Sequence, residues 1–292
     1  MAVTHVRFDW AIKRLLRDKA NFDILEGFLS VVLKEDIKIK NLLESEGNQA
    51  YKDDKYNRVD ILVENSQGEL MLVEVQNNSE IDYFHRMLYG VSKLITEYIK
   101  QGEPYGAIKK VFSFNIVYFG LGQGLDYVYE GSTSFTGLHK GDTLMPSYNQ
   151  IDEFAISQVQ QIFPRYWIFR INGFQNVAKT PLDEWIYFLK NSEIPQNFKA
   201  KGLNQAREKL KLDQLSDEEK KAYQRFLENR RIEKSELHTA RKEGEKRGEK
   251  RGEKKGKQKA QISIAKMMKN NGESLEKIAQ YTGLSQAEIQ AL

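Results

Sequence analysis

The stretch that decides the fold is NRVDILVENSQGELMLVEVQ, residues 57–76. It consists of two runs rich in Val, Ile and Leu, separated by Ser66-Gln67-Gly68. A three-residue hairpin loop needs one residue in the left-handed conformation, and Gly68 adopts that conformation without strain. The stretch therefore predicts a β-hairpin in which Asn65 faces Glu69.

The same register places Asp60 opposite Glu74 and Arg58 opposite Gln76. Because side chains alternate along a strand, one face of the hairpin is wholly apolar, whereas the other has Glu64 near the turn, is apolar in the middle and is polar at the open end. Two opposed carboxylates repel each other, burial removes their hydration, and a divalent cation between them relieves both costs. The hairpin thus predicts a metal site at Asp60 and Glu74. The alternative is a solvent-exposed strand end, and a loop of another length would break the register.

A third acid, Glu26, lies between Phe22 and Leu29 on an apolar stripe at helical spacing. A carboxylate on such a stripe needs a partner, and a metal ion would be one. The alternative is a glutamate at the helix boundary whose end reaches water.

The sequence around the hairpin predicts an alternation of helices and strands, and hence an α/β fold with a mixed central sheet flanked by helices. After Pro181 the pattern becomes helical and stays so, which predicts a helical C-terminal extension. The expected elements are a helix over 8–34 broken near 18–21, a short strand over 37–43, a helix over 81–101, and strands over 110–119 and 166–171. The helix over 81–101 has one broad apolar stripe, formed by Ile81, Phe84, Leu88, Val91, Leu94, Ile95 and Tyr98.

Composition limits the kinds of metal site. The 292-residue chain has no cysteine and only four histidines, which excludes thiolate ligands and makes a histidine-rich site improbable. Oxygen ligands remain, and they suit Mg²⁺ or Mn²⁺. No basic segment followed by an apolar run opens the sequence and no apolar run approaches ~20 residues, so we expect a cytoplasmic protein with no membrane partner.

Positive charge is concentrated in residues 241–260, which hold ten Lys/Arg and four Glu, a net of +6 within a chain whose total is +4. This segment repeats every four residues, with glycine at 244, 248, 252 and 256. Glycine weakens helices, so we interpret the segment as a solvated, partly helical linker. The alternative is a basic arm in which side chains such as Lys250 and Arg251 follow the phosphates of DNA.

These observations predict four parts of the chain. They are an α/β domain over 1–195 that contains the hairpin, a charged helical segment over 196–240, the basic glycine-containing linker over 241–260, and a small module of three short helices resembling a helix-turn-helix over 261–292. The last module has a net charge of zero, so packing or partner binding is favoured over base reading. Self-association through these C-terminal helices is a further expectation.

The pattern Asp60, thirteen residues, then Glu74-Val75-Gln76 resembles the PD-(D/E)XK nuclease core. More closely, the chain resembles the Rpn family of recombination-promoting nucleases, which are also described as transposases. The similarity covers roughly the first 105 residues and weakens towards residue 190. The resemblance implies Mg²⁺-dependent cleavage of DNA, with Asp60 and Glu74 as metal ligands and Glu26 as the acid that many relatives carry on the first helices.

The sequence departs from the family pattern at two positions. Val59 replaces the proline of the motif, and Gln76 replaces its lysine, which removes a positive charge from the site. Arg58 or Arg86 is a candidate to supply that charge by contacting phosphate. A metal-dependent DNA endonuclease is the leading hypothesis. A weakly catalytic DNA-binding or regulatory protein and a self-associating interaction protein are the alternatives.

Overall fold

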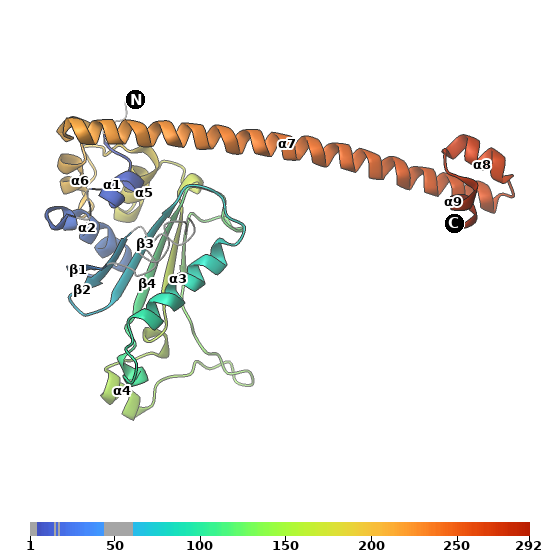
Figure 1. The fold of residues 1–292 in the computed structure, drawn as a ribbon. Helices are drawn as coiled ribbons and strands as arrows, with labels where there is room; N and C mark the ends of the chain where they lie inside the picture. Colours follow the sequence, from blue (N-terminus) through green and yellow to red (C-terminus); the bar gives the residue numbers. More distant parts are fainter. Residues whose placement is uncertain (1–4, 15, 17, 44–60) are drawn as a thin grey trace. The chain divides into compact units, whose positions relative to one another are not determined.

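The computed structural model describes residues 5–14, 16, 18–43 and 61–292. The chain divides into two compact units, residues 1–223 and 224–292. The first unit contains the whole sheet, and the second contains most of a long helix and two short ones (Figure 1).

A mixed sheet of six strands is the centre of the first unit, which confirms the predicted fold class. Its strands lie in the order β1-β2-β3-β4-β6-β5, and the neighbours β3/β4 and β4/β6 are parallel while the other neighbours are antiparallel. The strands are β1 (Ile39–Leu43), β2 (Ile61–Asn65), β3 (Leu70–Gln76), β4 (Val111–Val117), β5 (Val128–Gly131) and β6 (Arg165–Arg170).

The hairpin between β2 and β3 has the predicted register over its described length, with Ile61 paired to Val73 and Glu64 paired to Leu70. Its loop is closed by the side chain of Asn65, whose Oδ1 accepts hydrogen bonds from the backbone N–H groups of residues 67 and 69. Gly68 has a φ of 81°, as the loop type requires.

Helices cover both faces of the sheet (Figure 1). On one face α3 (Tyr83–Glu97) packs Val91 and Leu94 against Leu72 and its neighbours. On the other face Phe28 lies 5.5 Å from Phe169 of β6, measured between ring centroids. That second layer contains α1 (Phe8–Arg14), the 3-10 turn η1 (Lys19–Asn21), α2 (Phe22–Leu33), α5 (Pro181–Asn191) and α6 (Leu203–Lys209). The break predicted near 18–21 is therefore confirmed.

The buried side of α3 differs from the stripe predicted for residues 81–101. Tyr83, Met87, Val91 and Leu94 face the sheet, whereas Ile81, Phe84 and Leu88 are exposed. Both sets are apolar at helical spacing, so only the packing of the helix distinguishes them. The prediction was wrong for the exposed members of the stripe.

Between β4 and β6 the chain forms β5, which pairs with β6 at one end of the strand order, and then the short helix α4 (Tyr148–Phe154). Further 3-10 turns are η3 (Tyr105–Ala107) before β4, η4 (Val159–Gln161) before β6, η5 (Ile171–Gly173) after β6 and η6 (Leu212–Gln214) after α6.

The first unit extends beyond the domain boundary expected at residue 195. Leu203, Ala206 and Leu210 are completely buried, and the backbone N–H of Val6 donates to the carbonyl of Leu210 over 2.9 Å. The segment that follows residue 195 thus completes the core, because α6 packs against α2.

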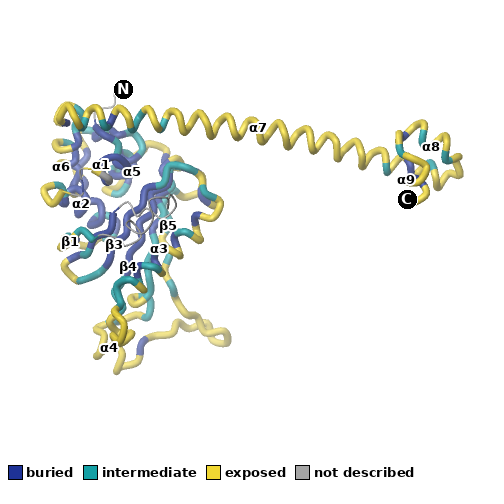
Figure 2. Tube along the Cα trace, in the orientation of Figure 1, coloured by how far each residue is buried: buried dark blue, intermediate teal, exposed yellow. Residues whose placement is uncertain are grey.

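The long helix α7 (Asp217–Asn270) runs through the basic repeat without interruption. The helix includes all of residues 241–260, where a partly helical linker was expected. Every residue of this segment is exposed (Figure 2). Pairs such as Arg247–Glu243, 3.0 Å apart, support it at a spacing of four residues.

The end of α7 packs with α8 (Leu275–Thr282) and α9 (Gln286–Gln290) around Ala265, Ile278 and Ile289. A capping box formed by Ser285 and Glu288 begins α9. The first helix of the expected three is the end of α7 and is not a separate short element. None of the described helices is both long and apolar enough to cross a membrane.

Candidate active site

Glu74 is a buried carboxylate near the carboxyl end of β3. It follows Leu70 and Leu72 on the face covered by α3, since side chains on one face of a strand recur every second residue. In the parallel neighbour β4 its Cα partner is Asn115. The strand therefore changes from apolar to polar on this face, as the sequence predicted.

A buried polar row surrounds this end of β3. Asn115, which is fully buried, donates from Nδ2 to Ser113 Oγ over 2.9 Å and to the carbonyl of Trp167 over 3.2 Å. Its Oδ1 accepts from the hydroxyl of Tyr83 on α3 over 3.2 Å. Because every group in this row is bonded, the floor of the site is held in one arrangement.

Gln76, Glu80 and Arg86 form a connected group at the end of β3. Gln76 Nε2 donates to Glu80 Oε1 over 2.5 Å. Arg86 Nη1 donates to both oxygens of Glu80 over 2.9 and 3.1 Å. A residue from the strand, one from the loop after it and one from the first turns of α3 are thus fixed together.

Arg86 keeps its positive charge in this place. Burial disfavours the charged guanidinium, but the carboxylates of Glu74 and Glu80 outweigh burial, so the pKa of Arg86 is raised above its ordinary value. The side chain is 17% exposed. Arg86 is therefore a mostly buried cation that is paired with Glu80 and stabilised by the charge of Glu74.

A second polar cluster joins the start of the chain to the same end of the sheet. Asp9, which is 2% exposed, accepts from Arg7 Nε over 3.1 Å and from Asn77 Nδ2 over 3.0 Å. The guanidinium of Arg7 lies 4.9 Å from the ring centre of Tyr118. Asn77 directly follows Gln76, so this cluster anchors the strand end that carries the site.

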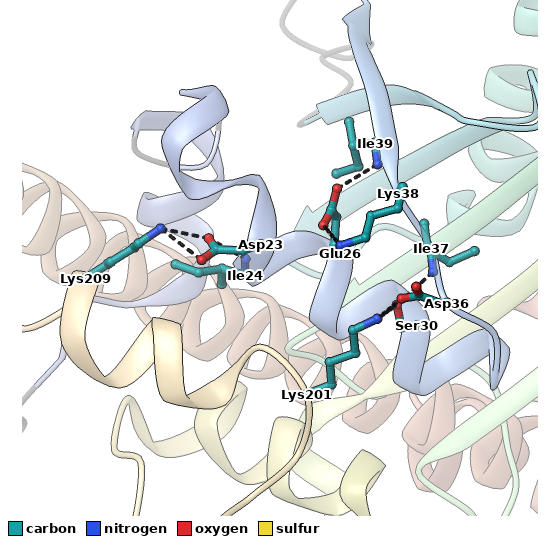
Figure 3. Close-up of polar contacts among 10 residues, drawn as sticks. All are labelled: Asp23, Ile24, Glu26, Ser30, Asp36, Ile37, Lys38, Ile39, Lys201 and Lys209. Atoms are coloured by element: carbon teal, nitrogen blue, oxygen red, sulfur yellow. Dashed lines mark hydrogen bonds and ion pairs between the residues drawn. The ribbon is translucent and has the colours of Figure 1, made fainter.

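The structure does not bring Glu26 to Glu74. Glu26 Oε2 accepts from Lys38 Nζ over 3.0 Å, and Oε1 accepts from the backbone N–H of Ile39 over 2.9 Å (Figure 3). Ile39 pairs with Asn65 at the turn of the hairpin. Residue 65 faces residue 69, and the five residues from there to Glu74 span roughly 17 Å of strand. The partners of this carboxylate are an ammonium and a backbone amide, and the role of Glu26 as a metal ligand stays a prediction.

The remaining predicted site residues lie elsewhere. Asp60 and Arg58 are outside the described residues. Lys250 and Arg251 are exposed on α7, in the second unit. Within residues 5–14, 16, 18–43 and 61–292 no group of three or more histidine, cysteine or acidic side chains is arranged to hold a metal ion.

Comparison with protein families identifies the part of the chain that carries this geometry. Residues 6–146 match the family described as PD-(D/E)XK nuclease family transposase. This segment belongs to that family. The match includes α1 to β5 and all of the predicted site residues except those on α7. No curated protein and no solved structure matches the chain.

For this PD-(D/E)XK transposase segment, two acids at the site were not found from the sequence. Glu80 and Asp9 both contact residues at the end of β3. The one sequence signal for Glu80 was its place between Gln76 and Arg86, four residues after the former and six before the latter. Asp9 stands 68 positions before its partner Asn77, a pairing that spacing does not reveal.

Proposed function

We propose that this protein is a Mg²⁺-dependent DNA endonuclease, or a Mn²⁺-dependent one, whose site lies at the open end of the β2–β3 hairpin. The observation that carries the proposal is Glu74, a buried carboxylate at the point where its strand face changes from apolar to polar, whose charge helps to keep Arg86 protonated. Its position within the segment that belongs to the PD-(D/E)XK nuclease family transposases supports the same function.

The donor chemistry at Glu74 fits a hard cation. We assign Glu74 and Asp60 as its ligands, because carboxylate oxygens are what Mg²⁺ and Mn²⁺ prefer. Bound there, the cation would supply Lewis-acid polarisation of a phosphate oxygen and would lower the pKa of a water molecule. Glu26 is left out of this ligand set since Lys38 and the amide of Ile39 hold it.

The other residues act on the substrate. Arg86 contacts a phosphate oxygen through the guanidinium that Glu80 holds, and Arg58, two positions before Asp60 in the sequence, adds positive charge. Gln76 orients the attacking water. Lys250 and Arg251 on α7 bind the DNA backbone without sequence preference.

The wider role follows from the family. We propose that cleavage promotes DNA recombination or the transposition of a mobile element, as the resemblance to the Rpn family suggests, and that the protein acts in the cytoplasm. We also propose that α7, α8 and α9 mediate self-association. Analytical ultracentrifugation over a range of concentrations tests this, and a constant monomer mass rejects it.

A second candidate function is DNA binding with weak catalysis. It is favoured by Gln76, which offers a neutral dipole where the family motif has a lysine. Comparing Gln76→Ala with Gln76→Lys separates the two functions. We expect the lysine variant to cleave at least as fast as the unmodified protein, because two or three nearby carboxylates keep its ammonium protonated.

The decisive experiment is the nicking of supercoiled plasmid DNA with and without Mg²⁺. We expect cleavage by the full chain and a loss of at least 100-fold in Asp60→Ala and in Glu74→Ala. Asp152→Ala, which removes an exposed carboxylate from α4, is the matched control and should cleave normally. Cleavage by Glu74→Ala at the rate of the control would reject the proposed site.

A further inference from the structure

Glu80 occupies a position that no step of the proposed reaction yet uses. Its two oxygens accept three hydrogen bonds, one from Gln76 Nε2 and two from Arg86 Nη1. The side chain is 24% exposed, so it lies at the edge of the site and not in bulk solvent. A charged carboxylate can only accept hydrogen bonds, and both neighbours therefore turn donors towards it.

This contact decides which end of the Gln76 amide is available. Because Nε2 is directed to Glu80, the carbonyl Oε1 is the atom that Gln76 offers to the site. A carbonyl oxygen accepts a hydrogen bond from water but repels the oxygens of a phosphate. Glu80 thereby selects a water-orienting role for Gln76 and excludes a phosphate-binding one.

The same contact sets the orientation of Arg86. Only Nη1 is bonded to Glu80, and in the described part of the chain Nε of Arg86 is buried without a hydrogen-bond partner. The guanidinium is thus held by Glu80 at one corner only, and the buried Nε makes no hydrogen bond within the described residues. Such a planar group, fixed on one side, suits a phosphate on the other.

We infer that Glu80 is a positioning residue, which holds the amide of Gln76 and the guanidinium of Arg86 in a fixed relation for cleavage. The inference rests on the proposed nuclease function. A displacement of about 1 Å at a catalytic group can reduce a rate by roughly 100-fold. We therefore expect Glu80→Ala to reduce single-turnover cleavage at saturating DNA by between about 10-fold and 100-fold.

DNA affinity separates this role from a loss of binding. Removing a negative charge beside the phosphate should leave DNA affinity, measured in Ca²⁺, unchanged or tighter. Glu80→Gln should also cleave DNA slowly, because the new amide N–H would face either Gln76 Nε2 or Arg86 Nη1, and both of these groups are donors. Glu80→Asp, which keeps the charge, should recover part of the rate.

Glu97→Ala is the matched control. Glu97 is a mostly buried carboxylate at the last residue of α3, paired with Lys93 over 3.5 Å, whereas Glu80 precedes the first turn of this helix. Its removal should leave the rate within about twofold of the unmodified protein. A mutant cycle gives the sharpest test. In a chain that already carries Gln76→Ala and Arg86→Ala, adding Glu80→Ala should reduce the cleavage rate little further.

A readout without catalysis distinguishes this inference from the proposed function. The side-chain amide signal of Gln76 in a nitrogen–proton NMR spectrum, assigned by its loss in Gln76→Ala, should shift in Glu80→Ala and not in Glu97→Ala. If the full chain does not cleave DNA, the nuclease proposal fails, and this signal still shows whether Glu80 holds the amide. Three results for Glu80→Ala would each overturn the inference. They are a normal cleavage rate, an unchanged Gln76 amide signal, and weaker Mn²⁺ binding, which would make Glu80 a metal ligand.

Discussion

The carboxylate of Glu26 shows how one side chain can be assigned from its contacts. It is bonded to Lys38 and to the amide of Ile39, so it has a structural role on α2. We expect Glu26→Ala to lower the free energy of unfolding by about 1.5–3 kcal/mol, the usual range for hydrogen bonds to a charged group. Urea denaturation measures this, and calorimetric titration should show unchanged Mn²⁺ affinity.

Asp23→Ala is the control for that substitution. Asp23 lies on the same helix and pairs with Lys209 over 2.9 Å, but both side chains are more than a third exposed. An exposed pair of this kind contributes less than about 1 kcal/mol. Should Glu26→Ala instead weaken Mn²⁺ binding as strongly as Glu74→Ala, Glu26 would have to be returned to the metal site.

His5 is a buried imidazole whose Nε2–H donates to the carbonyl of Arg207 over 3.1 Å. Burial is the main cause that lowers its pKa, the hydrogen bond to the Arg207 carbonyl and the charge of Glu193 oppose this effect, and the charges of Lys211 and Arg207 add to it. In the unfolded chain His5 is thus protonated near pH 6.5, where its imidazole in the folded protein is still neutral. The contribution of neutral His5 to the free energy of unfolding is therefore complete above that pH and is lost as the pH falls towards the lowered pKa.

We expect the free energy of unfolding to fall more between pH 7.5 and pH 5.5 in the unmodified protein than in His5→Gln. Glutamine keeps a donor for Arg207 but has no proton to gain. Urea denaturation at several pH values tests this, with His85→Gln, an exposed histidine, as the control. Parallel pH curves for His5→Gln and the unmodified protein would contradict the assignment.

At the scale of elements, α2 and the start of α6 approach each other through two glycines. A Cβ on Gly27 would lie 2.4 Å from the Cα of Gly202 and 2.5 Å from the carbonyl oxygen of Lys201. Backbone atoms cannot move aside as a flexible side chain does. We expect Gly27→Ala to destabilise the protein by at least about 1–3 kcal/mol, as overpacking usually does.

Gly90 of α3 is the matched control in a thermal unfolding experiment. A Cβ there would lie 3.8 Å from Leu72, an ordinary contact. Gly90→Ala should therefore be neutral or stabilise by up to about 1 kcal/mol through helix propensity. If Gly27→Ala and Gly90→Ala changed the melting temperature equally, α2 and the start of α6 would have to move apart without cost to admit the added methyl group.

The sequence was sufficient for elements that local rules determine. The hairpin register depends on a strand period of two and on Gly68, and both are local properties. The buried side of α3 was not predictable in the same way, since Ile81, Phe84 and Leu88 are as apolar as the residues that face the sheet. Likewise, the Glu80 and Asp9 contacts depend on where loops and helices meet the strand end.

The basic part of α7 should contribute to DNA affinity through counterion release. Each phosphate contact that is lost should reduce the slope of log affinity against log salt by about 0.9. We expect a chain ending at residue 240 to show a flatter slope in fluorescence anisotropy than the full chain. A chain ending at residue 260 keeps the ten basic residues and is the control; an identical slope in all three would make the segment a solvated helix only.

At the scale of the whole molecule, the first unit depends on residues far along the chain. Arg7 donates its backbone N–H to the hydroxyl of Tyr223 over 3.2 Å, and Leu203, Ala206 and Leu210 are completely buried. We expect a chain ending at residue 195 to unfold without cooperativity and to bind a hydrophobic dye, because α2 loses the helix that covers it. A chain ending at residue 223 should unfold in one transition.

Circular dichroism melting of the two shortened chains provides the comparison. Cooperative melting of residues 1–195 would mean that the core is complete without α6. In that case the backbone bond between Val6 and Leu210 would contribute little to folding.

That bond between Val6 and Leu210 has a consequence for synthesis on the ribosome. At about 5–20 residues per second, roughly 10–40 s pass between the emergence of the two residues. The β2–β3 hairpin, α3 and β4 lie within residues 61–117 and can assemble during this interval. The apolar side of α2 stays uncovered until α5 and α6 arrive, so the nascent chain offers a binding surface to chaperones for most of its translation.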